Sequence, residues 1–98
     1  MSSGPKPKPQ YTIVYTRDAL DGLASVQPKN RRRIMREKID KLVADPRPPG
    51  SRLLRNVDHE GRQVYRIRSG DYRALYGVPE SGGEITVLDV GHRKNVYR

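Results

Sequence analysis

The chain has 98 residues and a formal net charge of +9; 32% of its residues are charged and 34% are hydrophobic. This length fits one small domain, and the basic balance indicates an acidic partner such as nucleic acid. The chain has no cysteine, which excludes disulfides and thiolate metal sites and fits a cytoplasmic location. No apolar run approaches the roughly 20 residues that span a bilayer, so we expect no membrane association.

The N-terminal third predicts a tail, a strand and a helix. Residues 1–10 are rich in serine, glycine, proline and lysine, and we expect them to form a flexible tail ahead of a single domain over residues 11–98. The β-branched and aromatic run from Tyr11 to Thr16 predicts a strand. Thr16 should then cap a helix whose apolar stripe is Ala19, Leu20, Leu23 and Val26.

A second helix should begin near Pro28 and end near Ala44, before Pro46. Its expected buried stripe is Met35, Ile39, Leu42 and Val43, with Ile34 beside it. Its other faces carry Lys29, Arg31, Arg32, Arg33, Arg36, Lys38 and Lys41, against only Glu37 and Asp40. A charge run on a helix is usually a solvated face, but this one-sided sign favours a phosphate-facing surface of the kind that nucleic-acid-binding proteins present.

The remaining chain reads as strands. A proline-rich turn over Asp45–Gly50 precedes a strand that contains Leu53, Leu54 and Val57, and a turn over Asp58–Gly61 follows. A hairpin should pair Gln63–Ser69 with Tyr72–Val78, and Ile85–Val90 should form a central strand. The order β-α-α-β-β-β predicts an α+β fold, with two N-terminal helices packed on a mostly antiparallel sheet of four to five strands.

The hairpin should have two unlike faces. Its sequence alternates on both sides of Gly70-Asp71, which predicts a two-residue turn with Arg68 opposite Arg73. One face then carries Tyr65, Ile67, Tyr72, Ala74 and Tyr76, and the other carries Arg66, Arg68 and Arg73 with Leu75. Like charges opposite each other destabilise a sheet, so the arginine face suits a polyanion. The alternative is a solvated charged face that protects a small sheet.

Few residues offer catalytic chemistry. The two histidines are not in a ligand-spaced cluster, and neither a phosphate-binding loop nor a nucleophile elbow is present, so we expect no metal and no small-molecule cofactor. The residues that remain suit the cleavage of an RNA phosphodiester: Arg66, Arg68, Arg73, His92, Arg93 and Tyr97. His92 can move a proton near neutrality, and Tyr97 can stack on a base or exchange a proton. The alternative makes His92 a hydrogen-bonding residue at a strand end and Tyr97 a packing residue.

Two segments together resemble the RelE toxins of bacterial type II toxin–antitoxin systems. They are the hairpin from Tyr65 to Tyr76 and the C-terminal run from Val87 to Arg98, and the turn over Asp45–Gly50 and the basic helix before it are similar too. The resemblance implies a compact endoribonuclease that cuts messenger RNA in the ribosomal A site by attack of the 2′-hydroxyl, and that a cognate antitoxin neutralises.

By position, the resemblance assigns the family's basic pair to Arg66 and Arg68, the arginine after the hairpin turn to Arg73, the arginine after the Gly-His step to Arg93, and the C-terminal tyrosine to Tyr97. Many members have lysines at the first two positions, and a lysine can act as a base whereas an arginine cannot. Base duty would then fall to His92 or Tyr97. The sequence stops one residue after Tyr97, so we expect it to lack the helix that follows this tyrosine in some relatives.

Two other readings belong to different functional classes. A ParE-like toxin shares the fold and inhibits DNA gyrase without catalysis, but such toxins generally lack the full set of arginines and the tyrosine. A plain RNA-binding domain would explain the charge but not the clustering of basic residues near His92 and Tyr97.

Overall fold

The computed structural model describes residues 10–96, so the predicted tail (except Gln10) and Tyr97 lie outside the described residues. The elements in chain order are β1 (Tyr11–Tyr15), α1 (Arg17–Ala24), α2 (Lys29–Asp40), a 3-10 turn η1 (Lys41–Val43), β2 (Arg52–His59), β3 (Arg62–Ser69), β4 (Tyr72–Val78), β5 (Gly83–His92) and α3 (Arg93–Val96). The predicted α+β class is therefore confirmed, with five strands in the sheet.

The five strands lie in the order β1-β5-β4-β3-β2. The pairs from β2 to β5 are antiparallel, and β1 runs parallel to β5 at the opposite edge. The hairpin register is the one predicted, with Ser69 opposite Tyr72 and Arg68 opposite Arg73. Gly70 adopts a φ of +59°, which glycine tolerates at the first position of such a turn.

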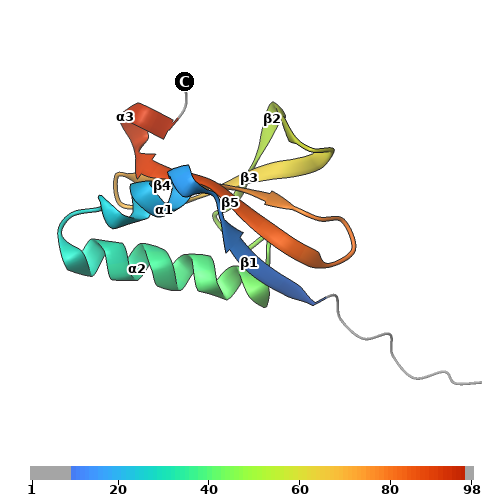
Figure 1. The fold of residues 1–98 in the computed structure, drawn as a ribbon, viewed down its shortest axis with the longest axis horizontal. Coiled ribbons are helices and arrows are strands. Elements are labelled where there is room, and N and C mark those ends of the chain that lie inside the picture. Colours follow the sequence, from blue (N-terminus) through green and yellow to red (C-terminus); the bar gives the residue numbers. More distant parts are fainter. Residues whose placement is uncertain (1–9, 97–98) are drawn as a thin grey trace, which may run out of the picture.

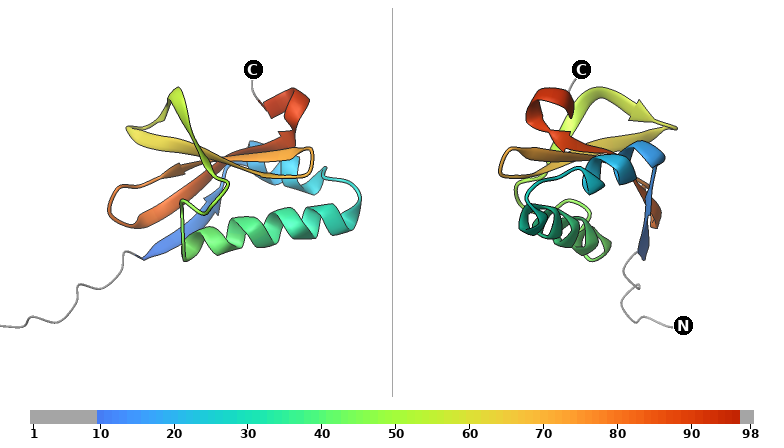
Figure 2. Two further views of the ribbon diagram at one scale, coloured as in Figure 1. Left: turned by 180° about the vertical axis from the view of Figure 1, so that it is seen from behind. Right: turned by 60° about the vertical axis from the view of Figure 1, so that its left-hand side comes forward.

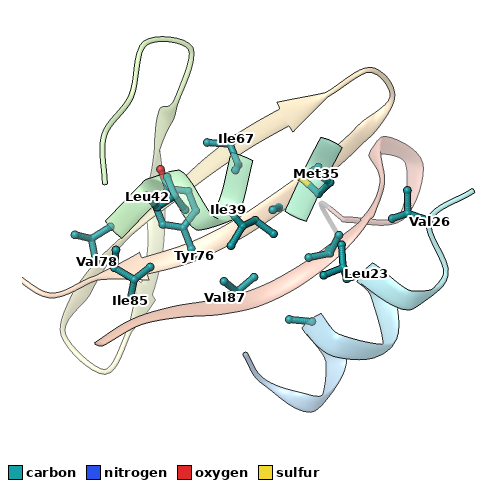
Figure 3. Close-up of a cluster of buried hydrophobic side chains, with 13 residues drawn as sticks. Leu23, Val26, Met35, Ile39, Leu42, Ile67, Tyr76, Val78, Ile85 and Val87 are labelled. Carbon is teal, nitrogen blue, oxygen red and sulfur yellow. The ribbon is translucent and has the colours of Figure 1, made fainter. Parts of the chain in front are cut away.

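The helices α1 and α2 cover one face of the sheet, and among the described residues the only helix on the other side is the single turn α3 (Figures 1 and 2). We call this other side the helix-free face, because neither α1 nor α2 covers it. Between the helices and the sheet lies a core of fully or almost fully buried side chains, the largest of which is Tyr76 (Figure 3). The core draws on both helices and on β3, β4 and β5, for example through Leu23, Met35, Ile39 and Val87. Burial of these apolar side chains is what holds the helix layer to the sheet.

Two apolar positions predicted for the core are exposed. Leu20 is 50% exposed on α1, and Val43 is 42% exposed in η1. The helix α2 ends at Asp40 and tightens into the 3-10 turn, which rotates the following residues away from the helical periodicity that predicted burial of Val43. On α1, Ala19 and Leu23 alone make the buried contact, because this short helix presents a narrow stripe to the sheet.

The start of α1 is fixed by the predicted cap. The Thr16 side chain accepts a hydrogen bond from the Ala19 amide at 3.1 Å and donates one to the Leu88 carbonyl at 2.9 Å. Further along α1, Gly22 lies against the backbone of Val90, where any Cβ would collide with the Val90 carbonyl. Thr16 and Gly22 therefore hold α1 closely against β5.

The proline-rich loop between η1 and β2 is anchored to the sheet by two side chains. The Tyr76 hydroxyl donates to the Pro46 carbonyl at 2.7 Å, and Arg47 Nε donates to the Tyr65 hydroxyl at 2.9 Å. The Arg47 guanidinium also lies 5.2 Å from the centre of the Tyr65 ring. Burial raises the pKa of the Tyr76 hydroxyl, so this group remains a neutral donor to the loop.

A single helical turn, α3, follows β5 and ends at Val96, ahead of Tyr97. The expected lack of a helix after Tyr97 concerns residues outside the described part of the chain. The turn begins where the backbone amide of Arg93 donates to the Asp71 carbonyl of the β3–β4 hairpin at 2.7 Å. Figures 1 and 2 show α3 and β2 on the side of the sheet away from α2, one near each end of the helix-free face. The strand β5 thus leads the chain out onto that face.

Candidate functional site

The helix-free face of the sheet carries Arg62, whose guanidinium donates to the Glu84 carbonyl at 3.1 Å, and four further arginines in two adjacent cross-strand rows. One row runs from Arg52 on β2 to Arg66 on β3, and continues to Leu75 and Asp89 on β4 and β5. The next row pairs Arg68 with Arg73 and ends at Gly91. We call the four guanidinium-bearing residues Arg52, Arg66, Arg68 and Arg73 the arginine face.

Two residues of the arginine face, Arg66 and Arg73, have partly buried side chains. The Nε atoms of Arg66 and Arg73 are buried. A terminal nitrogen of Arg73 also lies 3.4 Å from the Gly70 carbonyl, which it can reach as a donor across the hairpin turn. Because these side chains are constrained, their outer guanidinium nitrogens present fixed positive charge to a ligand on this face.

Arg93 joins this region from α3. Its backbone is tied to the hairpin turn at Asp71, and its Nε atom lies 3.9 Å from the Asp71 carboxylate. The pair is mostly solvent-exposed, so it contributes little to stability. Its consequence is positional: Arg93 stays beside the turn that connects Arg68 to Arg73.

His92 does not join the arginines. The β4–β5 register pairs it with Tyr72, whose side chain packs on the core, and the two rings meet edge to face with centroids 5.7 Å apart. The His92 Nδ1 atom accepts a hydrogen bond from the Lys94 amide at 3.2 Å. His92 therefore points to the helix side of the sheet, and its ring nitrogen accepts a hydrogen bond at the start of α3.

The basic residues of α2 and η1 divide among several environments. The Lys38 ammonium donates to the Arg68 carbonyl at 2.9 Å, and the Arg31 guanidinium lies against Gly70 at the hairpin turn. Arg32 turns inward and donates to the Val26 carbonyl at 3.4 Å. Only part of this predicted RNA-binding set therefore borders the arginine face.

The other members lie elsewhere. Arg33 pairs with Glu37 at 3.4 Å on the exposed side of α2, and Arg36 lies near Tyr15 of β1, where its charge opposes a rise in the pKa of that hydroxyl caused mainly by burial. Lys29 is exposed at the first turn of the helix. Lys41 lines a pocket that it shares with Lys38 and Arg68.

The structure adds two residues that sequence reasoning did not assign to the site. Arg52 joins the arginine face because β2 pairs with β3 opposite Arg66. Asp89 ends the same row, and partial burial raises the pKa of its carboxyl, an effect that a hydrogen bond with the Val90 backbone opposes. The charge of Arg52 was visible in the sequence, but its strand register was not.

Within residues 10–96, no group of three or more histidine, aspartate or glutamate side chains could hold a metal ion. In the same part of the chain, no helix is both long enough and apolar enough to cross a bilayer. The charged groups of the two rows are the four guanidiniums of the arginine face and the Asp89 carboxylate on β5.

Comparison with known proteins gives a consistent set of relatives. Residues 13–97 match the family model described as the ParE toxin of the type II toxin–antitoxin system parDE. The chain is 26% identical over 88 residues to Toxin RelG of Mycobacterium tuberculosis, an alignment that covers 90% of this chain and 97% of that protein.

Two solved structures are similar over nearly the whole domain. The archaeal RelE–RelB complex from Pyrococcus horikoshii OT3 matches with a TM-score of 0.71 and 27% identity, over 89% of this chain and 99% of the other. The toxin–antitoxin complex RelBE2 from Mycobacterium tuberculosis matches with a TM-score of 0.63 and 25% identity, over 86% and 99%. The chain therefore belongs to the RelE/ParE family of toxins of type II toxin–antitoxin systems.

Proposed function

We propose that this toxin is an endoribonuclease that cleaves messenger RNA in the ribosomal A site and thereby inhibits translation in the cytoplasm. The observation that carries the proposal is the arginine face, where Arg68 and Arg73 are directly paired and Arg93 is held beside them. A phosphodiester gains negative charge as it reacts, so guanidinium groups fixed in advance stabilise that charge more than they stabilise the unreacted RNA.

In this reaction the phosphorus exchanges its bond to the 5′-oxygen of the next nucleotide for a bond to the 2′-oxygen of its own ribose. The ribose 2′-hydroxyl oxygen attacks the adjacent phosphorus and loses its proton to a base, while the bond to the 5′-oxygen of the next nucleotide breaks. That oxygen takes up a proton, which leaves a 2′,3′-cyclic phosphate on one fragment and a 5′-hydroxyl on the other. In this scheme, Arg66, Arg68, Arg73 and Arg93 hold the phosphate and balance its charge.

The group that exchanges protons with the RNA must be a residue other than the arginines. Arginine stays protonated, so the arginine face supplies charge rather than a proton acceptor. His92 is engaged by the Lys94 amide and packed on Tyr72, which suits a residue that positions α3 and with it Arg93. We therefore propose that Tyr97, two positions after Asn95, stacks on the RNA and takes part in proton transfer.

Ribosome binding is the second element of the proposal. Lys29, Arg31, Arg32, Arg33, Arg36, Lys38 and Lys41 are proposed to contact RNA, and the exposed members have the sign that ribosomal RNA requires. A site without a strong base needs its substrate positioned from outside, which the ribosome would provide. We also propose a cognate antitoxin as partner, because both solved relatives are toxin–antitoxin complexes.

One observation favours a second candidate function, inhibition of DNA gyrase. The family model that matches is described as ParE toxin, so a non-enzymatic inhibitor of DNA gyrase is the alternative. The paired arginines and Arg93 favour the nuclease, since an inhibitor that only binds protein has no need for like charges opposed across a hairpin. The RelG and RelE relatives are consistent with this preference.

The test is primer extension on purified ribosomes programmed with a defined message, run beside a DNA supercoiling assay with purified gyrase. We expect new message ends at the A-site codon with the wild-type toxin, their loss with Arg93→Ala, and no effect on gyrase. The matched control is Arg17→Gln, which removes a charge on α1 away from the helix-free face. Intact messages together with inhibited supercoiling would replace the proposal with the gyrase alternative.

A further inference from the structure

A pocket of about 330 Å³ lies beside the arginine face, between the end of the α2 layer and the edge of β3. Three cationic residues line it, namely Lys38, Lys41 and Arg68. Its other walls include Pro48 and Pro49 from the anchored loop and Ile67 from β3. Arg68 thus belongs both to the pocket and to the arginine face.

The walls of the pocket are held in place by the sheet. Pro48 and Pro49 follow directly after Pro46 and Arg47, which Tyr76 and Tyr65 bind by hydrogen bonds of 2.7 and 2.9 Å. On the other side, Lys38 is fixed by its bond to the Arg68 carbonyl. A ligand therefore meets a largely preformed surface and loses little affinity to ordering the loop.

The edge of β3 at this pocket is closed to an added strand. The strand β2 begins at Arg52, opposite Arg66, so Arg68 lies beyond the end of β2. A peptide that extended the sheet here would need the Arg68 carbonyl as an acceptor, but Lys38 already occupies that carbonyl at 2.9 Å. This arrangement disfavours an extended peptide and leaves a pocket with cationic and apolar walls.

We propose that this pocket binds a nucleotide of single-stranded RNA next to the nucleotide being cleaved. The proposal rests on the proposed function and extends it. The prolines and Ile67 would contact the base, and Lys38 and Lys41 would contact its phosphate, because bases pack on apolar side chains and lysine binds phosphate as a point charge. Arg68 lines the pocket and is paired with Arg73 on the arginine face, so an RNA chain that crosses this face would reach the pocket around the edge of β3.

Lys41 is the residue through which to test the pocket. Lys38 also supports β3 through the Arg68 carbonyl, and Arg68 is part of the proposed catalytic set, so replacing either would change more than the pocket. Lys41→Gln removes one charge at an exposed position in η1. The control is Arg17→Gln, an exposed position on α1, whose ion pair with Asp21 is solvent-exposed.

The probe is a short single-stranded oligoribonucleotide that carries a 2′-deoxy sugar at one position and therefore cannot be cut there. Its dissociation constant is measured by fluorescence anisotropy at several salt concentrations for wild type, Lys41→Gln and Arg17→Gln. We expect Lys41→Gln to weaken binding roughly 3- to 10-fold and to reduce the salt slope by about 0.7, the value of one lost single-strand phosphate contact. Arg17→Gln should leave both quantities unchanged.

A second measurement locates the base. The same oligonucleotide with a photoreactive 4-thiouridine next to the deoxy position should cross-link to the loop that contains Pro48 and Pro49. Lack of binding by the wild type, an unchanged salt slope in Lys41→Gln, or cross-links confined to other segments would overturn the proposal. The alternative occupant of a pocket with cationic and apolar walls is an acidic, apolar peptide, for which a short peptide of glutamate and leucine is the probe. If Lys41→Gln weakened binding of that peptide and left RNA binding unchanged, the proposal would also be overturned.

The outcome is separable from that of the proposed function. Cleavage of ribosome-bound message by the wild type tests the nuclease, whereas binding of the non-cleavable oligonucleotide tests the pocket. A toxin that cuts messages but binds the oligonucleotide equally well with and without Lys41 would retain its activity and lose this subsite. A toxin that cuts nothing would lose the nuclease assignment, and the binding data would still decide whether the pocket takes RNA.

Discussion

Arg68 and Arg73 lie directly opposite each other across the β3–β4 hairpin, on the face of the sheet that neither α1 nor α2 covers. Such a cross-strand pair of like charges lowers stability, so the hairpin is less stable than a version with one neutral partner. The arrangement concentrates positive charge where a phosphate can bind. Stability and the proposed activity therefore place opposite demands on these two positions.

We expect Arg73→Gln to reduce cleavage of the message without reducing thermal stability. Cleavage of ribosome-bound message should fall by about 100-fold or more, the size of effect seen when one donor to a developing anion is removed. The melting temperature should be no lower than that of the wild type, because the substitution relieves the repulsion between Arg68 and Arg73. Calorimetry and primer extension on one protein preparation measure both. A clearly lower melting temperature would mean that Arg73 has a structural role instead.

Gly22→Ala tests the close packing of α1 on β5. On an exposed helix this change would stabilise by about 1 kcal/mol, since alanine is the better helix former. Here the new Cβ would collide with the Val90 carbonyl, and a backbone atom cannot move aside as a side chain can. We expect a net loss of about 1–3 kcal/mol in the free energy of unfolding, the range for an overpacked core. Urea denaturation measures it, and a stabilised variant would contradict the packing.

Leu20 and Leu23 are one turn apart on α1 and should respond differently to truncation. Leu23→Ala should lower the free energy of unfolding by about 2–5 kcal/mol, because Leu23 is buried in the core. Leu20→Ala should change it by about 0.5 kcal/mol or less, because Leu20 is half exposed. Equal losses at the two positions would show that the face of α1 directed at the sheet is wider than the structure indicates.

Asp89 gives a prediction about pH. Burial raises the pKa of its carboxyl, so the folded protein holds this proton more tightly than the unfolded chain does. The protonated Asp89 carboxyl therefore contributes fully to stability below the pKa of the unfolded chain, about 3.9. This contribution is lost as the pH rises through the raised pKa of the folded protein. Asp89→Asn cannot ionise and avoids that loss.

We therefore expect Asp89→Asn to melt at a higher temperature than the wild type at pH 7, with the difference shrinking as the pH falls toward 4. Thermal melts between pH 3 and pH 8 measure this trend. Glu84→Gln on the same strand is the control, because it removes a carboxylate from an exposed position. A destabilised Asp89→Asn at neutral pH would mean that the carboxylate makes a favourable contact in its charged form.

The local part of this structure followed from the sequence. Alternation around Gly70-Asp71 gave the hairpin, its register and the two unlike faces, because side-chain direction in a strand depends only on residue parity. Thr16 marked the start of α1 for an equally local reason, since a cap bonds to an amide three residues away. The resemblance of the hairpin and the C-terminal segment to RelE toxins pointed to the family that the comparisons identified.

Tertiary contacts decided the rest. The burial of Leu23 instead of Leu20, and the exposure of Val43, depend on which side of each helix meets the sheet. Arg52 lies on the arginine face because of a strand pairing that only the assembled sheet defines. His92 lies apart from the arginines because its side chain packs against Tyr72. Sequence patterns specify directions along one element, whereas a site on a sheet is built across elements whose registers are set by packing the whole core.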